Sequence, residues 1–286
     1  MVEIKSIANL NRFREVTTTL LRYGFDDLVQ RLDLPGKTIA QKITHVAPDT
    51  GVYERIRLAI EELGPTFVKF GQVMSLRSDI LPRQLTREFF KLQDEVPPER
   101  FEDVRPVLEN NLQQSLDQFF ALFDPQPLAA ASLSQVHRGT LRSDKRAVAV
   151  KVQRPGIRRK IETDLNILAF IAERLHANFE DLKIYELPDL VRMVRRSLRR
   201  ETDFTAEARY MRIARARMAD FEGLYIPEPL IEHCTEQLLV MEYVEGRKLK
   251  DLEAGMLKDP AATARLGLEV AVKQFLEDGF FHADPH

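Results

Sequence analysis

The spacing of hydrophobic residues predicts a helical first part of the chain. Apolar side chains recur at helical spacing through residues 1 to about 34, and the pattern returns from Tyr53 to Leu63 after a loop. A new helix is expected to begin at Pro65 or the residue after it, because proline is tolerated in the first helical turn. With a further helix at Phe101–Leu112, the first 125 residues are expected to form an all-helical block.

The pattern then changes to that of β-strands. Residues 127–141 indicate a loop followed by a strand, and residues 142–146 a hairpin turn. The returning strand is Ala147–Gly156, in which β-branched valines alternate up to an Arg-Pro-Gly turn signal. A further buried strand is expected at Gln237–Val244.

Three more helices are expected, two between these strands and one after the last of them. They are predicted at Ile157–Phe179, Leu187–Phe221 and Arg265–Phe275. The first half of the second helix is rich in arginine, which favours a solvated face over an anionic membrane surface. Asp203 and Glu207 are expected on one face of this helix, and surface pairing with nearby arginines is the plain alternative.

Composition narrows the class of protein. The chain has 286 residues, 44% hydrophobic and 30% charged, which is typical of a globular protein in water. A net charge of −2 gives no general attraction to nucleic acid, and a single cysteine suits a reducing cytosol. No apolar run reaches the length of a membrane span. The chain ends within GFFHADPH, which suggests a piece of a longer protein.

Lys151 is the first candidate for chemistry. A buried ammonium group is costly unless it is paired, so a lysine among alternating valines needs an acidic partner or an anionic ligand. A snorkelling surface lysine is the alternative. The small residues before the preceding strand could let backbone N–H groups approach phosphate oxygens, although a simple turn is also consistent with them. These residues are Ala129, Ala130, Ala131 and Ser132.

A second cluster lies on the helix that begins at Pro65. Lys69 and Gln72 are one turn apart and can reach the same ligand or carboxylate. Gly71 between them suggests a close approach of another segment, because glycine weakens a helix interior. A solvated lysine beside a packing glycine is the alternative.

These motifs occur in the order found in protein kinases. Val240–Val244 has the form of a kinase hinge, and His282–His286 is similar to the start of a catalytic loop. From about residue 5 to its end, the sequence resembles the UbiB/ADCK, or AarF-domain, family of atypical kinases. The specific marks are Lys69–Gln72 for the KxGQ motif, the Ala-rich segment, Glu201-Thr-Asp203 for the ExD motif, and the HADPH sequence.

The resemblance implies an α+β fold: a protein-kinase-like N-lobe, made of an antiparallel sheet and helices, with a helical N-terminal extension and an incomplete C-lobe. The implied domains are the KxGQ extension at 1–125, the N-lobe at 126–246 and the start of the C-lobe at 247–286. We expect the extension to place the KxGQ motif near the nucleotide, where peptide substrate would otherwise bind.

The resemblance also implies roles for individual residues. Lys151 is expected to contact the ATP α- and β-phosphates and to pair with Glu207, with the Ala-rich segment around the phosphates. Backbone groups of Glu242 and Val244 would bind adenine. Asp284 would be the catalytic-loop aspartate, and Lys69, a further catalytic candidate, would meet Glu201 or Asp203 by charge.

The implied function is that of an atypical kinase or ATPase that uses ATP and magnesium in ubiquinone or related isoprenoid-lipid metabolism. The metal ligands are expected beyond His286, so the chain alone is expected to be inactive. Expected partners are a nucleotide, anionic membrane lipids, and quinone precursors with their biosynthetic enzymes, without nucleic acid. The expected location is cytoplasmic, peripheral to the membrane. The alternatives are a nucleotide-gated scaffold that presents lipids without phosphoryl transfer, and an active small-molecule or protein kinase.

Overall fold

The chain forms two compact units that interleave along the sequence. The computed structural model describes residues 7–35, 47, 49–92, 96–247, 252, 256–257 and 259–281, with side chains from residue 10 onward. The helical unit is drawn from residues 1–98, 130–133 and 154–202. The sheet unit is drawn from residues 99–129, 134–153 and 203–286.

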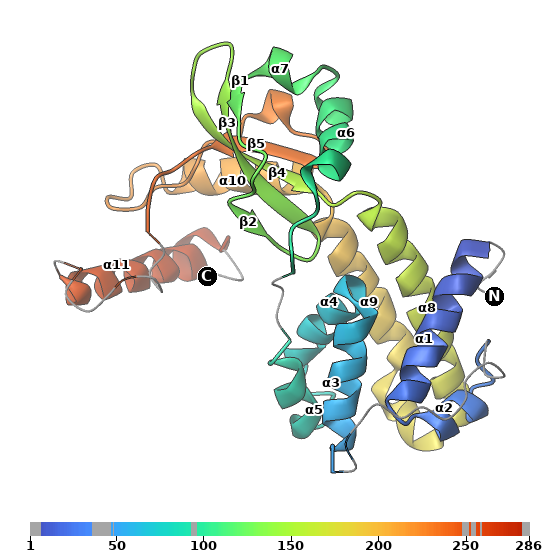
Figure 1. Cartoon of the computed structure of the whole chain (residues 1–286). Helices are drawn as coiled ribbons and strands as arrows, with labels where there is room; N and C mark the ends of the chain where they lie inside the picture. Colours follow the sequence, from blue (N-terminus) through green and yellow to red (C-terminus); the bar gives the residue numbers. More distant parts are fainter. Residues whose placement is uncertain are drawn as a thin grey trace. The chain divides into compact units, whose positions relative to one another are not determined.

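The helical unit consists of helices packed against one another (Figure 1), and two clusters of buried apolar side chains lie among its described residues. Gly24 lies between α1 and α2, and its φ of +74° is a conformation that glycine adopts readily. The predicted helix start at Pro65 is confirmed. The helices are α1 (Ile7–Arg22), α2 (Asp26–Arg31), α3 (Val52–Leu63), α4 (Pro65–Ser75), α5 (Arg83–Phe89), α8 (Ile157–Asn178), a 3₁₀ helix (Glu180–Tyr185) and α9 (Leu187–Glu201).

The sheet unit contains an antiparallel sheet in the order β1-β3-β4-β5, with β2 paired to β3. In Figure 1, α6 and α10 lie beside this sheet. The strands are β1 (Phe120–Phe123), β2 (Ala129–Ala130), β3 (Ser134–Leu141), β4 (Ala147–Gln153) and β5 (Leu238–Glu242). The helical segments are α6 (Phe101–Leu112), α7 (Leu116–Phe119), α10 (Phe204–Arg217), a 3₁₀ helix (Ile231–His233), α11 (Pro260–Val272) and a π-helical segment (Lys273–Asp278).

Burial explains the position of β4 in the middle of the sheet. Val148, Val150 and Val152 are almost fully buried and pack in one apolar cluster with residues of α6 and β5. The predicted hairpin is confirmed, because β3 and β4 pair antiparallel on either side of the turn. An α+β fold with an antiparallel, kinase-like N-lobe sheet is therefore present.

The expectation of an all-helical block up to residue 125 is wrong. Phe120–Phe123 is a strand, β1, which pairs with β3 from Phe120 opposite Leu141 to Phe123 opposite Gly139. Aromatic residues favour a strand when a neighbouring strand offers pairing and burial, and Phe120 is buried. The expected functional division at 125 and 246 stays a prediction, whereas the compact units change over several times along the chain, first after residue 98.

The expectation of one helix over Leu187–Phe221 is also wrong. Helix α9 ends at Glu201 and α10 begins at Phe204. Asp203 is the N-cap of α10, and its side chain accepts a hydrogen bond from the Thr205 backbone N–H, which stabilises a helix start at that point. Asp203 and Glu207 therefore do not lie within one continuous helix. The predicted Arg265–Phe275 helix is present but begins earlier, at Pro260.

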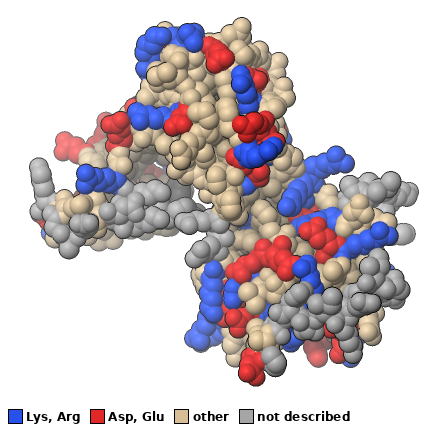
Figure 2. All heavy atoms as spheres, in the orientation of Figure 1, with Lys and Arg blue, Asp and Glu red and all other residues tan. Residues whose placement is uncertain are grey.

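Surface charge is mixed in sign. On the face seen in Figure 2, basic and acidic side chains are interspersed. Glu162 on α8 accepts hydrogen bonds from two of the five α9 arginines, Arg195 and Arg199, at 2.8 and 2.7 Å. Among helices of the described residues, none combines the length and apolar character that crossing a membrane requires.

Candidate functional site

Lys151 and Glu207 form an ion pair within the sheet unit. The Lys151 Nζ donates to both carboxylate oxygens of Glu207, at 2.8 Å each. It also lies 4.8 Å from the centre of the Phe204 ring, a cation–π distance. The predicted ion pair is therefore confirmed.

The local fold explains the orientation of Lys151. The residue lies at the centre of the sheet, opposite Val136 of β3 and Leu239 of β5. Strand alternation places the buried Val150 and Val152 on the other face. The Lys151 side chain retains 25% of its exposure and that of Glu207 37%, so the ammonium group can still reach an anionic ligand.

The Ala-rich segment passes from the surface into the protein within four residues. Ala129 is exposed, Ala130 and Ala131 are half-buried, and Ser132 is fully buried. Among the residues that the structure describes, the Ser132 hydroxyl has no hydrogen-bond partner. Residues 130–133 belong to the helical unit. Ser132 therefore lies in the interior of that unit. The predicted contact of these four residues with phosphates stays a prediction.

The KxGQ motif lies on α4 and makes three separate contacts within the helical unit. The Lys69 Nζ lies 2.8 Å from the Glu201 Oε1, which confirms the predicted pairing with one of the ExD carboxylates. A Cβ atom at Gly71 would lie 2.3 Å from the Leu92 Cδ1, which confirms the expected close approach. The Gln72 Nε2 donates to the Leu92 carbonyl at 3.2 Å. The motif therefore also holds the segment that follows α5. Its predicted position near a nucleotide stays a prediction.

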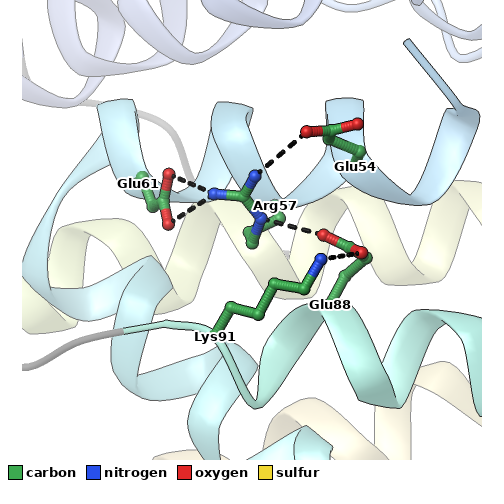
Figure 3. A network of polar contacts seen from close by, with 5 residues as sticks. All are labelled: Glu54, Arg57, Glu61, Glu88 and Lys91. Atoms are coloured by element: carbon green, nitrogen blue, oxygen red, sulfur yellow. Dashed lines mark hydrogen bonds and ion pairs between the residues drawn. The ribbon is translucent and has the colours of Figure 1, made fainter.

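A charged network holds α5 against α3 and so helps to place Leu92 (Figure 3). The Arg57 guanidinium on α3 bonds Glu61 at 2.8 Å and Glu88 on α5 at 2.9 Å. Glu88 also pairs with Lys91, and hydrogen bonds from Lys91 and Arg57 lower the pKa of its carboxyl. Leu92 follows directly in the chain.

Asp203, the second carboxylate of the ExD motif, has a structural partner. It accepts hydrogen bonds from the Thr205 hydroxyl at 2.6 Å and from the Thr205 backbone N–H at 3.0 Å. These bonds lower the pKa of the Asp203 carboxyl, the hydroxyl having the larger effect. Glu201 is the last residue of α9, whereas Asp203 is the N-cap of α10, so the two carboxylates have different surroundings.

The hinge candidate lies at the end of β5. The Glu242 backbone N–H donates to the Glu228 carbonyl at 2.8 Å, so this group is engaged within the protein. The Glu242 carboxylate accepts a hydrogen bond from the Tyr225 hydroxyl at 2.6 Å, which lowers the pKa of Glu242 and raises that of Tyr225. Val244 is 44% exposed. Adenine binding by Glu242 and Val244 stays a prediction.

Asp284 and the rest of the HADPH sequence lie outside the described residues. Within the described part of the chain, no group of three or more His, Cys, Asp or Glu side chains is arranged to hold a metal ion. Phe204 and Tyr225 were not predicted from the sequence. Phe204 follows the ExD motif directly and Tyr225 precedes a Pro-Glu-Pro sequence, but neither position identifies its partner.

The sequence of the chain is similar to those of several known proteins. A family model described as the ABC1 atypical kinase-like domain matches residues 91–286. The chain is 36% identical to the probable protein kinase UbiB of Aeromonas salmonicida, over 96% of this chain and 52% of that protein. It is 33% identical to the probable protein kinase UbiB of Vibrio cholerae, over 98% of this chain and 53% of the relative. The chain therefore spans about half the length of these curated relatives.

Two further matches were found. An uncharacterized protein in the hydrogenase 1 5′ region of Clostridium pasteurianum is 34% identical, over 96% of this chain and 49% of its own length. Among solved structures, the complex of Rv3197 with erythromycin from Mycobacterium tuberculosis matches with a TM-score of 0.43 and 26% identity. That match covers 65% of this chain and 46% of the other.

Proposed function

The chain belongs to the ABC1 atypical kinase-like family, within the UbiB/ADCK group, and from this membership we propose that it binds ATP. As part of a longer protein, it would act as an atypical kinase or ATPase that supports ubiquinone or related isoprenoid-lipid metabolism. The observation that carries the proposal is the ion pair between Lys151 and Glu207, whose Nζ–Oε distances are 2.8 Å. A strand lysine paired with a helix glutamate is what kinases use to position phosphates.

In the proposed mechanism, Lys151 binds and orients the α- and β-phosphates of ATP. Glu207 holds the ammonium group in place through both carboxylate oxygens, and the Phe204 ring limits its movement from one side. Magnesium, when bound, would neutralise phosphate charge. Asp284 would orient the attacking group.

Lys69 has a supporting place in this proposal. Its ammonium group is held by Glu201, and only 16% of its side chain is exposed. We propose that Lys69 is needed for the turnover of ATP. Loss of turnover with retained ATP affinity in a Lys69→Met protein would support that assignment.

The direct test is calorimetric titration of the full-length protein with ATP and ADP. Lys151→Met should weaken nucleotide binding about tenfold or more, because it removes a charge-assisted contact to phosphate. The matched control is Lys183→Met, since Lys183 pairs with Glu180 on an exposed 3₁₀ helix. Equal affinities for the wild-type and Lys151→Met proteins would contradict the proposal.

A second test separates chemistry from scaffolding. Cells carrying full-length wild type should complete quinone synthesis, whereas cells carrying Asp284→Asn should accumulate intermediates. Normal quinone levels in the Asp284→Asn cells would favour a nucleotide-gated scaffold.

Anionic lipids and quinone precursors are the proposed partners. Co-sedimentation of the protein with phosphatidylglycerol vesicles, compared with phosphatidylcholine vesicles, tests the binding of anionic lipid.

A further inference from the structure

Arg138 lies on the same face of the sheet as Lys151. Residues directly opposite one another on neighbouring antiparallel strands point to the same face, and side chains alternate between faces along each strand. Arg138 of β3 lies opposite Ala149 of β4, and Lys151 follows two residues later on β4. Ala149 in turn lies opposite Met241 of β5. One face therefore carries two cationic side chains, with small or apolar residues beside them.

The Arg138 side chain reaches across β4 to the segment that follows β5. Its guanidinium carbon lies 4.4 Å from the centre of the Tyr243 ring, a cation–π distance. Its Nη2 lies 3.4 Å from the Glu245 Oε1. Because β4 lies between β3 and β5 (Figure 1), and neighbouring strands are about 4.8 Å apart, the side chain has to cross β4 to make these contacts. Ala149, opposite Arg138, has only a methyl group and leaves room for the crossing.

Tyr243 fixes one side of the guanidinium plane. Its backbone N–H donates to the Ala147 carbonyl at 3.1 Å, which ties the residue to the start of β4. Glu245 is a weaker partner, because its side chain is 80% exposed and solvent screens the attraction. The Arg138 side chain keeps 47% of its exposure, so a flat ligand can still reach the guanidinium from the side away from Tyr243.

The two cationic groups lie at opposite ends of this face. Ala147, the backbone partner of Tyr243, is four residues from Lys151, which corresponds to about 13 Å along β4. In the proposed function, Lys151 binds phosphates, and the backbone on either side of Tyr243 binds adenine. The Arg138 guanidinium is therefore at the adenine end. Arginine suits this end because its planar guanidinium stacks on nucleobases, whereas a lysine ammonium group has no plane to stack.

We infer that Arg138 binds the base of the nucleotide, by stacking the open side of its guanidinium plane on adenine. Tyr243 is a positioning residue, whose ring holds that plane from the other side without touching the nucleotide. This inference rests on the proposed function and adds to it a residue that contacts the base. It predicts a selective effect: affinity for the adenosine part of the ligand depends on Arg138, and affinity for the phosphate part does not.

The test is calorimetric titration of the full-length protein with ADP, with adenosine and pyrophosphate measured by displacement of ADP. Arg138→Ala should weaken adenosine and ADP binding about fivefold each, because one stacking contact is lost, with pyrophosphate affinity unchanged. Arg138→Lys should lose nearly as much, since it keeps the charge without the plane. The matched control is Arg105→Ala, because Arg105 on α6 has a similar exposure, 46%, and pairs with Glu109. It should bind all three ligands as the wild type does.

A second variant, Tyr243→Leu, tests the positioning role. It should weaken adenosine binding when Arg138 is present and cost nothing further in the Arg138→Ala background, because Tyr243 acts through Arg138. Fully additive losses in the double variant would overturn this role.

A measurement on the wild type alone keeps the test decisive if a variant does not fold. Adenosine, but not pyrophosphate, should slow the modification of Arg138 by phenylglyoxal, followed by peptide mass spectrometry. Equal rates with and without adenosine, or an adenosine affinity of Arg138→Ala equal to or higher than that of the wild type, would overturn the inference. A loss of pyrophosphate affinity would also overturn it, by showing a phosphate contact or a general structural role. Failure of the wild type to bind ADP would instead overturn the proposed function, and the inference with it.

Discussion

Lys69 on α4 and Glu201 at the end of α9 form an ion pair with an Nζ–Oε1 distance of 2.8 Å. This pair joins the KxGQ and ExD motifs, 132 positions apart (201 − 69), within one unit of the structure. The Glu201 side chain is 41% exposed, so solvent screens the attraction and its contribution to stability should stay below about 1 kcal/mol.

The two acids of the ExD motif should therefore respond differently to substitution. Asp203→Ala should lower the free energy of unfolding by about 1 kcal/mol, because α10 loses its N-cap. Glu201→Gln should change it less. Urea denaturation followed by circular dichroism measures both, and Asp203→Asn is the control because asparagine also caps helices. Equal losses for Ala and Asn at position 203 would contradict the capping argument.

Gly71→Ala should destabilise the protein by about 1 to 3 kcal/mol through overpacking. The added Cβ would lie 2.3 Å from the Leu92 Cδ1, and Phe89 and Ile60 close the space around it. Leu92 is buried, so its side chain cannot swing aside into solvent. The measurement is the urea midpoint of the single variant.

The matched control for this prediction is the same substitution in a Leu92→Ala background. There the clash is absent, and alanine should stabilise α4 by up to about 1 kcal/mol over glycine. Gly71→Ala would then raise stability instead of lowering it. A cost that is the same in both backgrounds would show that the Leu92 contact does not explain the glycine.

The sequence correctly predicted those strands and turns whose characteristic residue pattern lies within the element itself. The strand around Lys151 has alternating valines, and its hairpin turn is short, so both were predicted correctly. Strand β1 was missed because its support comes from β3, up to 21 positions later (Leu141 opposite Phe120). The break at Asp203 was missed because apolar spacing continues across it, although an aspartate at that point is also typical of a helix start.

Long-range contacts at the site were predictable only in part. The order of motifs pointed to the pairing of Lys151 with Glu207, and opposite charge pointed to Lys69 with Glu201 or Asp203. Neither order nor charge identifies a carbonyl acceptor, so the bond from Gln72 to Leu92 could not be predicted. Periodicity also cannot show that residues 130–133 and 154–202 return to the helical unit.

Stability should fall as pH falls through the range of histidine titration, because of His137. This side chain is fully buried on β3, and burial lowers its pKa below the ordinary value of 6.5. Its Nδ1 donates to the Asp124 carbonyl at 2.9 Å, and its Nε2 lies 2.8 Å from the Gln135 side-chain nitrogen, which donates to it. A proton on Nε2 would oppose that donor.

The sign follows from the two states. Well above pH 6.5 the ring is neutral in both the folded and the unfolded state, so His137 adds no pH dependence there. Below pH 6.5 the unfolded chain binds the proton first, and unfolding becomes easier by at most about 1.4 kcal/mol per pH unit, until the folded state is protonated too. Urea denaturation from pH 7.5 to 5 measures this slope. His137→Gln should reduce this slope, and an unchanged slope in His137→Gln would contradict the assignment.

Arg12→Met should be the most destabilising of these substitutions, at about 3 to 5 kcal/mol, because it leaves a buried carboxylate without its partner. Asp164 on α8 is fully buried, and the Arg12 Nε on α1 donates to its Oδ1 at 2.7 Å. Arg12 also donates to the Leu63 carbonyl at the end of α3 and lies over the Phe67 ring of α4. In the double variant Arg12→Met, Asp164→Leu, no charge is buried, so much of the stability should return. Urea denaturation of the two variants measures the difference, and a double variant less stable than Arg12→Met alone would show that packing around α1, and not the unpaired charge, carries the loss.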